Sequence, residues 1–598
     1  RPRRAGVSSF GFTGTNAHVL IEEAPPQPAR PESDTHEQPF HVLALSARSP
    51  EALVALAQRY DAWLGAHPEV DLADVCRTVG TGRSHFEHRA ALVVDSVQGA
   101  REGLAELAES RLRPGVVRGE HTHRPTTAWL FTGQGSQYPG MARELFDAEP
   151  VFAETVTRCA DAVGDMLPRP LLEVLFATDR EIAQSLRHTS FAQPALFAVE
   201  MGLARLWQSC GIEPDVVLGH SVGQYAAACV AGVFSLEDGA RLMAERGRLF
   251  GSLPEGGRMV AVFTDAKHVE ELAGAFPRVS VGAYNGPNTV LSGPGEDLEQ
   301  IVARFGDQGT RCTWLETSHA FHSELLDPVL GEFESYAAQL EFDVPTLPLV
   351  CNRTGAVLTV QTPIDAQYWR RHSRQPVQFA ESVRTVAALG CSVLMEIGPQ
   401  PVLTGAAVQV WPEHLAAPRA IVSLRKGVGD RRQITDALAA AYVGGHQPDF
   451  ASLYRQPTRR LELPTYPFQR RRFWPKTSNI AIDGPAVSGI LGSAKDLASG
   501  DSVYTSRLSV KSQPWLSDHV IYGTVVVPGA TYAAMALAAV GAPARVKDVF
   551  FYEPIILPEK TSREVQLTLH PLEDGTGSSF KVHSRPYGVR DAEWSFNA

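Results

Sequence analysis

The segment DVVLGHSVGQYAAACVAG, from Asp215 to Gly232, places one serine where a nucleophile would be useful. It opens as a buried strand and continues as a helix with alanine on its packed face. Gly219 and Gly223 lack a Cβ, so strand and helix can approach closely on either side of Ser221. This arrangement predicts a nucleophile elbow, a sharp turn that exposes a serine hydroxyl above a parallel sheet. The alternative is a chance G-x-S-x-G in a glycine-rich chain.

A serine hydroxyl is a weak nucleophile until a nearby base takes its proton. The segment SHAFHSELLDPV offers His322 and His319 as the base, and the residues alone do not choose between them. An oxyanion formed by the attack needs two N–H donors. Val222, directly after the serine, is placed to supply one, and Gln134 in the loop FTGQGSQ is placed to supply the other. The alternative for that loop is a plain turn.

Arg246 lies in LMAERGRLF, on the helix expected after the elbow helix. A buried arginine at this position would be costly unless it bound an anion, and its planar fork suits a carboxylate. The alternatives are a solvated arginine and a structural ion pair.

The composition describes a large globular protein. Its 598 residues predict about three to five domains. A net charge of −11 argues against nucleic acid as a ligand. Seven scattered cysteines without a C-x-x-C pair fit the reducing cytoplasm and indicate neither disulfides nor zinc. Without a signal peptide or an apolar run of about 20 residues, we expect no membrane partner. The first residue is not Met and opens in mid-pattern, so we expect part of a longer chain.

Periodicity divides the chain into several units. Residues 41–113 predict a small α+β unit, and alternating strands and helices from 126 to about 424 predict an α/β body. Within that body, residues 258–312 follow the order β-α-β-β-α-β of a ferredoxin-like insert. The proline-punctuated strip at 463–475 is too apolar for a free linker, so we expect it to pack along a domain surface. Strands and Gly-Pro turns with one apolar helix follow residue 487.

Taken together, GQGSQ, GHSVGQYAAACVAGVFSLEDGARLMAERG, AYNGP and HAFHSELLDPV resemble the acyltransferase domain of type I modular polyketide synthases. That domain is related to malonyl-CoA:acyl-carrier-protein transacylase. The flanks agree: GVSSFGFTGTNAHVLIEEAP looks like the end of a ketosynthase, and WLSDHVIYGTVVVPGATYAAMALAA looks like the start of a dehydratase. LPTYPFQRRRFW looks like the linker that follows the acyltransferase and folds back over it.

The resemblance implies an α/β multidomain fold. The acyltransferase body is α/β-hydrolase-like with a ferredoxin-like subdomain, flanked by a small α+β linker domain and a partial hotdog domain. The expected parts are a ketosynthase C-terminal tail at 1–24, a linker domain at 25–125, the acyltransferase at 126–425 with its ferredoxin-like subdomain at about 256–318, a post-acyltransferase linker at 426–485, and the N-terminal hotdog of a dehydratase at 486–598.

The resemblance also implies roles for the site residues. Ser221 becomes the nucleophile and His322 its base, without an acidic third member, and Arg246 binds the free carboxylate of the extender unit. The backbone N–H groups of Gln134 and Val222 receive the oxyanion. The substrate pocket is lined by Gln193, His220, His319, Ala320 and Phe321.

The implied reaction is ping-pong acyl transfer. The serine takes an acyl group from an acyl-CoA and passes it to the phosphopantetheine thiol of an acyl carrier protein, with no bound cofactor or metal. In this family HAFH at 319–322 accompanies malonyl-CoA, and so does valine after the serine. Phe321 is bulky enough to occupy the space of an α-methyl group, which is worth only about 1–3 kcal/mol. We therefore expect a preference for malonyl over methylmalonyl, without strict exclusion.

The dehydratase resemblance rests on H-x-x-x-G-x-x-x-x-P at His519, Gly523 and Pro528, in which His519 is the general base. The family's opening His-Pro-Leu-Leu-Gly reads Ser-Gly-Ile-Leu-Gly at 488–492, which indicates a divergent dehydratase or one retained for structure. The sequence covers about one hotdog repeat, and we expect the catalytic Asp of this family to lie in a second repeat.

The implied partners are an acyl carrier protein, the ketosynthase and other modules, and a second copy in a homodimeric synthase. Two other readings compete. A stand-alone serine hydrolase or thioesterase shares the elbow but needs neither Arg246 nor the flanking segments. An inactive scaffold acyltransferase needs neither Ser221 nor His322.

Overall fold

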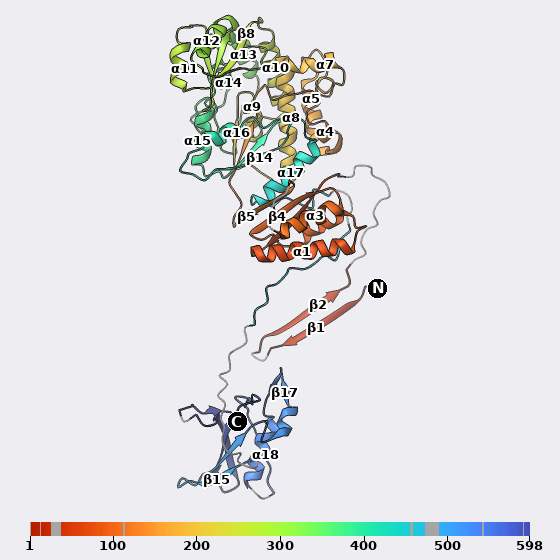
Figure 1. Ribbon diagram of the computed structural model, residues 1–598, viewed down its shortest axis with the longest axis vertical. Helices are drawn as coiled ribbons and strands as arrows, with labels where there is room; N and C mark the ends of the chain where they lie inside the picture. The colour runs from red at the N-terminus through yellow and green to blue at the C-terminus, as the bar shows by residue number, and fades with distance from the viewer. Residues whose placement is uncertain are drawn as a thin grey trace. The chain divides into compact units, whose positions relative to one another are not determined.

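The computed structural model describes residues 2–11, 14–24, 38–109, 111, 114–454, 459–472, 490–540, 543–589 and 591–598 (Figure 1). The chain divides into two compact units, Arg1–Gln469 and Arg470–Ala598. The boundary expected at 485–486, the departure at 488–489 and the last three residues of the strip at 463–475 lie outside the described residues. None of the described helices combines the length and the apolarity needed to cross a membrane.

The first unit begins with an antiparallel hairpin and a small α+β layer. The hairpin pairs β1 (Arg4–Phe10) with β2 (Asn16–Glu22). The small layer is an antiparallel sheet in the order β3-β4-β5, and α1 and α3 lie side by side against it (Figure 1). Its elements are β3 (His41–Ala47), β4 (His88–Val94), β5 (Val116–Glu120), α1 (Pro50–Ala66), α2 (Leu72–Gly82) and α3 (Val97–Ala108).

The body of the first unit is built on five parallel strands in the order β12-β7-β6-β13-β14. The strands are β6 (Thr127–Phe131), β7 (Val216–Gly219), β12 (Leu349–Val350), β13 (Val393–Ile397) and β14 (Arg419–Val422). Every residue of β6, β7 and β13 is buried, which is why these segments are apolar on both faces. In sequence terms the order is 3-2-1-4-5, and such doubly wound sheets bind ligands beyond the carboxyl ends of their strands.

Helices cover this sheet. The longest described helix, α8 (Thr189–Ser209), packs against α5, α9 and α10. The helices are α4 (Arg143–Ala148), α5 (Pro150–Val163), α6 (Leu171–Leu175), α7 (Arg180–Gln184), α9 (Gly223–Val230), α10 (Leu236–Gly251), α13 (Asp327–Ala337), α14 (Ala366–Arg374), α15 (Phe379–Ala388), α16 (Thr404–Gln409) and α17 (Asp430–Val443).

The ferredoxin-like insert is confirmed. Its elements are β8 (Gly257–Val262), α11 (Ala266–Ala273), β9 (Ser280–Tyr284), β10 (Thr289–Pro294), α12 (Gly295–Asp307) and β11 (Cys312–Trp314). They form an antiparallel sheet in the order β11-β8-β10-β9. The insert has a hydrophobic core of its own, to which Val260, Leu291 and Phe305 belong. It therefore folds as a subdomain that interrupts the body between α10 and α13.

The strip after the body packs along a surface of the first unit, as expected, over its residues 463–469. The Leu461 N–H donates to Thr78 Oγ1 at 3.2 Å, and Arg83 Nη2 donates to the Leu463 carbonyl at 2.9 Å. The Arg48 N–H donates to Tyr466 Oη at 3.0 Å. These contacts are made with the small α+β layer, whereas the resemblance implied a linker lying over the catalytic body.

The second unit is a five-stranded antiparallel sheet in the order β15-β16-β19-β20-β21 with one apolar helix. The helix, α18 (Gly529–Val540), packs on β19 through buried Tyr532, Met535 and Ala536. The strands are β15 (Ser493–Asp496), β16 (Ser502–Leu508), β19 (Arg563–Pro571), β20 (Ser578–Pro586) and β21 (Ser595–Phe596), with the short hairpin β17 (Val520–Ile521) and β18 (Thr524–Val525).

Gly223, two residues after the elbow serine, leaves no room for a side chain. A Cβ added at Gly223 would lie 2.3 Å from the Phe131 carbonyl oxygen and 2.5 Å from that of Thr132. We expect Gly223→Ala to destabilise the body by about 1–3 kcal/mol or more, because backbone atoms would have to move. Gly331→Ala is the control: Gly331 lies in α13 with no atom within 4 Å, and alanine there should be neutral or stabilising by up to about 1 kcal/mol. Urea unfolding followed by tryptophan fluorescence measures both, and equal effects would contradict the close-approach argument.

Candidate active site

Ser221 occupies the turn between β7 and α9. Its φ of 53° is left-handed, a conformation that costs free energy for a residue with a Cβ. The turn is fixed from both sides. The His220 N–H donates to the Phe131 carbonyl at 3.0 Å, and a Cβ at Gly219 would lie 2.1 Å from the Gln224 nitrogen. The crossing of strand and helix therefore forces the turn that carries the serine.

His322 faces this serine. Ser221 Oγ lies 2.8 Å from His322 Nε2, and His322 Nδ1 lies 2.8 Å from the carbonyl oxygen of Gln375. A carbonyl can only accept, so Nδ1 carries the proton and the Nε2 lone pair faces the serine hydroxyl. This tautomer is the one in which a histidine can take the Ser221 proton.

The environment keeps this imidazole neutral. Burial lowers the pKa of His322 to about 3, and the positive charge of Arg246 is the next cause. At neutral pH the ring is therefore uncharged and holds its lone pair available.

His319 has a different environment. Its Nδ1 lies 2.9 Å from Ser318 Oγ, and its Nε2 lies 3.1 Å from the Leu253 carbonyl oxygen. Both ring nitrogens thus have partners other than Ser221, and Nε2 attaches the HAFH segment to the chain that follows α10. Of the two candidate histidines, the structure brings His322 to the serine and His319 away from it.

The loop after β6 lies against the turn that carries Ser221, because a Cβ at Gly133 would lie 3.1 Å from the His220 carbonyl oxygen. Gln134 is held through its side chain, which receives a hydrogen bond from Gln193 Nε2 at 3.2 Å and donates to Thr189 Oγ1 at 2.7 Å. Among the described residues, no hydrogen bond uses the backbone N–H of Gln134 or of Val222. Val222 directly precedes α9, where the helix dipole favours negative charge. Two main-chain donors are thus available for an oxyanion.

Arg246 is deeply buried, with 1% of its surface exposed. Its Nε donates to Ser373 Oγ at 3.4 Å, and its Cζ lies 4.4 Å from the centre of the Phe250 ring. Neither Nη1 nor Nη2 meets the geometry of a hydrogen bond with another described residue, and burial lowers the pKa of the guanidinium. A buried cation with two unpaired nitrogens is costly, and a bidentate carboxylate would satisfy both.

The remaining residues expected at the pocket surround this centre. His220 Nε2 lies 3.0 Å from Asn285 Oδ1, in the AYNGP segment, and burial lowers the pKa of the ring. Gln193 is fully buried, and its Oε1 has no partner in the described part of the chain. Phe321 packs against Phe250, with ring centres 6.3 Å apart. Because Phe250 also lies against Arg246, the Phe250 ring lies between Phe321 and the guanidinium.

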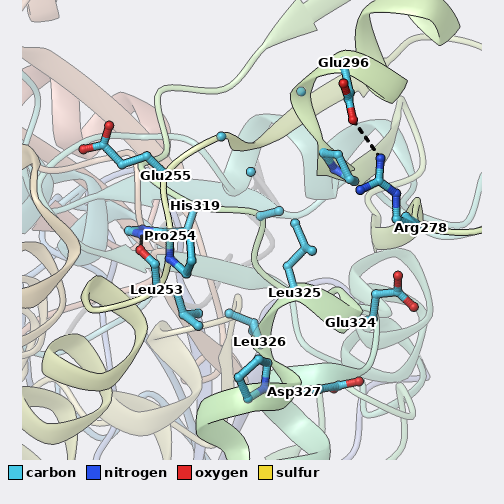
Figure 2. A pocket seen from close by; sticks show the side chains of 16 residues that line it. Leu253, Pro254, Glu255, Arg278, Glu296, His319, Glu324, Leu325, Leu326 and Asp327 are labelled. Carbon is cyan, nitrogen blue, oxygen red and sulfur yellow. Dashed lines mark hydrogen bonds and ion pairs between the residues drawn. The ribbon is translucent and has the colours of Figure 1, made fainter.

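A pocket of about 960 Å³ lies next to this centre (Figure 2). His319 and Ala320 line it, together with the segments 253–257, 294–296 and 324–328. Neither Ser221 nor His322 is among its lining residues, so the pocket adjoins the catalytic pair without containing it. Figure 2 shows several carboxylates at the pocket, with Arg278 paired to Glu296 at 2.8 Å.

His519 in the second unit is oriented in the same way as His322. Its Nδ1 lies 2.8 Å from the Val526 carbonyl oxygen, which leaves the Nε2 lone pair free to accept a proton. Gly523, in the turn of the β17–β18 hairpin, has a φ of +77°, which favours glycine. The sequence motif thus marks a partly exposed histidine in a defined tautomer.

Sequence reasoning missed several residues at the first site. Gln375 acts through its carbonyl group, so its side-chain type carried no signal. Tyr225, His372 and Ser373 were not singled out, because their position beside Arg246 depends on how α9, α10 and α14 pack. For Asn285 a signal existed, since it lies within the AYNGP segment.

Comparison with protein families identifies three regions. Residues 128–448, more than half of the chain, match the acyl transferase domain family. Residues 41–104 match a family described as CurL-like, PKS C-terminal, and residues 489–585 match the polyketide synthase dehydratase domain.

The alignments with two similar proteins extend over the whole chain. A phenolphthiocerol synthesis polyketide synthase type I, Pks15/1, of Mycobacterium marinum is 41% identical, and polyketide synthase GfsB of Streptomyces halstedii is 39% identical. The chain spans 29% of the first protein and 11% of the second.

Solved structures agree with the fold. The acyl transferase domain of ZmaA is 30% identical with a TM-score of 0.67, and the alignment covers 72% of this chain and all of that one. The acyltransferase domain from the second module of the salinomycin polyketide synthase is 39% identical with a TM-score of 0.58, covering 69% of this chain and 95% of that one.

The buried base predicts an unusual pH dependence. Phenylmethylsulfonyl fluoride should modify Ser221 at a rate proportional to the neutral fraction of His322. Because burial and Arg246 lower that pKa to about 3, the rate constant should stay constant from pH 8 down to about pH 5. If His322 had the ordinary histidine pKa of about 6.5, the rate constant of modification would be roughly 30-fold lower at pH 5 than at pH 8. Intact-mass spectrometry measures the modification, and Ser221→Ala serves as the unlabelled control.

In the same assay, Arg246→Gln should move the acid limb to higher pH, because it removes the second cause of the shift. A parent limb near pH 6.5 would contradict the buried, neutral base.

Proposed function

The chain belongs to the acyl transferase family of type I polyketide synthases and matches the polyketide synthase dehydratase domain over residues 489–585, and from that premise we propose that it loads malonyl units. In this proposal Ser221 takes the malonyl group from malonyl-CoA and passes it to the phosphopantetheine thiol of an acyl carrier protein. The proposed reaction needs no bound cofactor.

The first half-reaction acylates the serine. His322 Nε2 takes the hydroxyl proton while Ser221 Oγ attacks the thioester carbonyl, and the N–H groups of Gln134 and Val222 receive the oxyanion. The C–S bond then breaks, the coenzyme A sulfur takes the proton from His322, and the malonyl ester remains on Ser221. In the second half-reaction the carrier thiol gives its proton to His322 and attacks the ester, and His322 returns that proton to the serine.

The observation that carries the proposal is the buried guanidinium of Arg246. Its two terminal nitrogens make no hydrogen bond of good geometry with a described residue, and the free carboxylate of a malonyl group would pair both of them. A related structure gives support: the acyl transferase domain of SpnD, 30% identical with a TM-score of 0.62, is described in complex with 2-(pent-4-yn-1-yl)malonyl. A simple hydrolase would have no use for this residue.

Further parts of the proposal rest on the family. Gln193, His220, His319, Ala320 and Phe321 shape the acyl pocket. His519 is the general base of a dehydratase site. The proposed domain boundaries are those expected from the sequence. The proposed partners are an acyl carrier protein, the ketosynthase and other modules of a homodimeric synthase.

Loading from malonyl-CoA tests the proposal. Intact-mass spectrometry should show a malonyl adduct that is absent in Ser221→Ala. His322→Ala should slow loading by about 10²–10⁴-fold, the usual contribution of a positioned base. His319→Ala is the matched control and should be less damaging, because its nitrogens contact Ser318 and Leu253. Rapid loss of the adduct to water would indicate a hydrolase, and no adduct at all would indicate a scaffold.

A second prediction concerns the α-methyl group. Replacing His319-Ala320-Phe321-His322 by Tyr-Ala-Ser-His keeps the base and removes the Phe321 ring. The preference for malonyl over methylmalonyl should fall without reversing, because Val222 remains and one methyl group is worth only about 1–3 kcal/mol. Competition between the two CoA thioesters, read as the ratio of the acyl-enzymes, measures the change. An unchanged ratio in a variant that still loads malonate would place selectivity elsewhere.

A further inference from the structure

Unpaired polar atoms gather around Arg246. Within the described residues, the buried side-chain atoms without a hydrogen-bond partner include both terminal nitrogens of Arg246, the hydroxyl of Tyr225 and both ring nitrogens of His372. Each of the three side chains is at most 1% exposed. Buried polar groups in native proteins are nearly always paired, so such a cluster needs an explanation.

The three side chains form one contiguous group. The Arg246 guanidinium carbon lies 5.5 Å from the centre of the Tyr225 ring, and the rings of Tyr225 and His372 lie 5.4 Å apart at 85°. Arg246 Nε reaches Ser373, the neighbour of His372, at 3.4 Å. The His372 ring lies 6.2 Å from the ring of His322, which contacts Ser221. The group therefore extends from the guanidinium to the catalytic base.

Packing alone does not account for His372. Its ring lies among the aromatic rings of Trp369, at 5.4 Å, and Tyr368, at 6.1 Å. A phenylalanine would fill that space without burying two unpaired nitrogens. Tyr225 poses the same question: its ring stacks on Trp369 at 4.0 Å, while its hydroxyl interacts with Arg246 and Ser373 without a hydrogen bond of good geometry to a described residue.

We propose that Tyr225 and His372 are specificity-determining residues that bind, together with Arg246, the carboxylate of the acyl substrate. A carboxylate offers about four lone-pair positions, and a guanidinium fork occupies two of them. The Tyr225 O–H and one N–H of His372 then donate to the remaining positions. This inference rests on the proposed function and names the residues that recognise the substrate carboxylate.

The charge state of both residues suits this role. Burial raises the pKa of Tyr225, so its hydroxyl keeps the proton that it donates. Burial, followed by the charges of His322 and Arg246, lowers the pKa of His372 well below its ordinary value. His372 is thus a neutral donor and does not add a second buried cation beside Arg246.

The arrangement explains how an uncharged acyl group would be rejected. An acetyl group offers no acceptor to the terminal nitrogens of Arg246, the Tyr225 hydroxyl and the His372 N–H, whereas the carboxylate of a malonyl group accepts from them. Sites built around a hydrogen-bonded substrate group reject analogues that lack it by up to about 10⁴–10⁵-fold. Two neutral donors around one cation give this discrimination without a second charge.

The test compares loading of malonyl-CoA and acetyl-CoA by intact-mass kinetics on the whole chain. Tyr225→Phe and His372→Phe should each lower kcat/KM for malonyl-CoA by about 10-fold or more and leave acetyl-CoA unchanged or faster. His372→Asn retains a donor and should recover part of the malonyl loading. Tyr368→Phe is the matched control: its hydroxyl already contacts Cys351 Sγ at 3.4 Å, so the malonyl-to-acetyl ratio should not move.

The outcomes separate this inference from the proposed function. An unchanged malonyl-to-acetyl ratio in both Tyr225→Phe and His372→Phe overturns the inference, whether or not loading of the two substrates falls. Tyr225→Phe decides the question alone if His372→Phe does not fold, because it removes one hydroxyl from a retained ring. Arg246→Ala addresses the proposed function instead. If Arg246→Ala lowers malonyl and acetyl loading equally, or if the parent does not load malonate, the proposed function itself is wrong.

Discussion

The close approach of α9 to β7 at Gly219 and to the end of β6 at Gly223 is the constraint on which the catalytic geometry depends. A Cβ at Gly219 would lie 2.1 Å from the Gln224 nitrogen, and one at Gly223 would lie 2.3 Å from the Phe131 carbonyl oxygen. Strand, helix and the end of β6 are therefore held against one another, and Ser221 takes a left-handed conformation in the turn between them. These two backbone contacts thus place the nucleophile, the Val222 N–H and the loop that carries Gln134.

The local part of this arrangement was readable in the sequence, because glycine spacing and apolar runs report directly on backbone contacts. The order of the ferredoxin-like insert was predictable for the same reason, since each of its elements is locally periodic. The choice between His319 and His322 was not, because it depends on which ring reaches Ser221 and which reaches the Leu253 carbonyl. Tyr225 and His372 were equally hidden, since being buried without a partner is a property of the packed structure.

His322 and His519, in separate units, are oriented by the same kind of hydrogen bond. His322 Nδ1 faces the Gln375 carbonyl and His519 Nδ1 faces the Val526 carbonyl, each at 2.8 Å. In each case a neutral carbonyl fixes the tautomer that leaves Nε2 free to accept a proton. A carboxylate in that position would also stabilise the imidazolium, whereas a carbonyl contributes orientation and a weaker dipole. The low pKa of His322 is consistent with that difference, because no negative charge offsets its burial.

The same guanidinium links substrate recognition to the base. Arg246 is the second cause of the low pKa of His322, and its unpaired nitrogens are the proposed contact for the malonyl carboxylate. A carboxylate bound there would offset the positive charge that opposes imidazolium formation, so His322 would become a stronger base when an acidic acyl group is present. Acetyl groups would leave that charge uncompensated. On this argument the discrimination lies partly in the chemical step, because one charge governs both how the acyl group is held and how readily the Ser221 proton is removed.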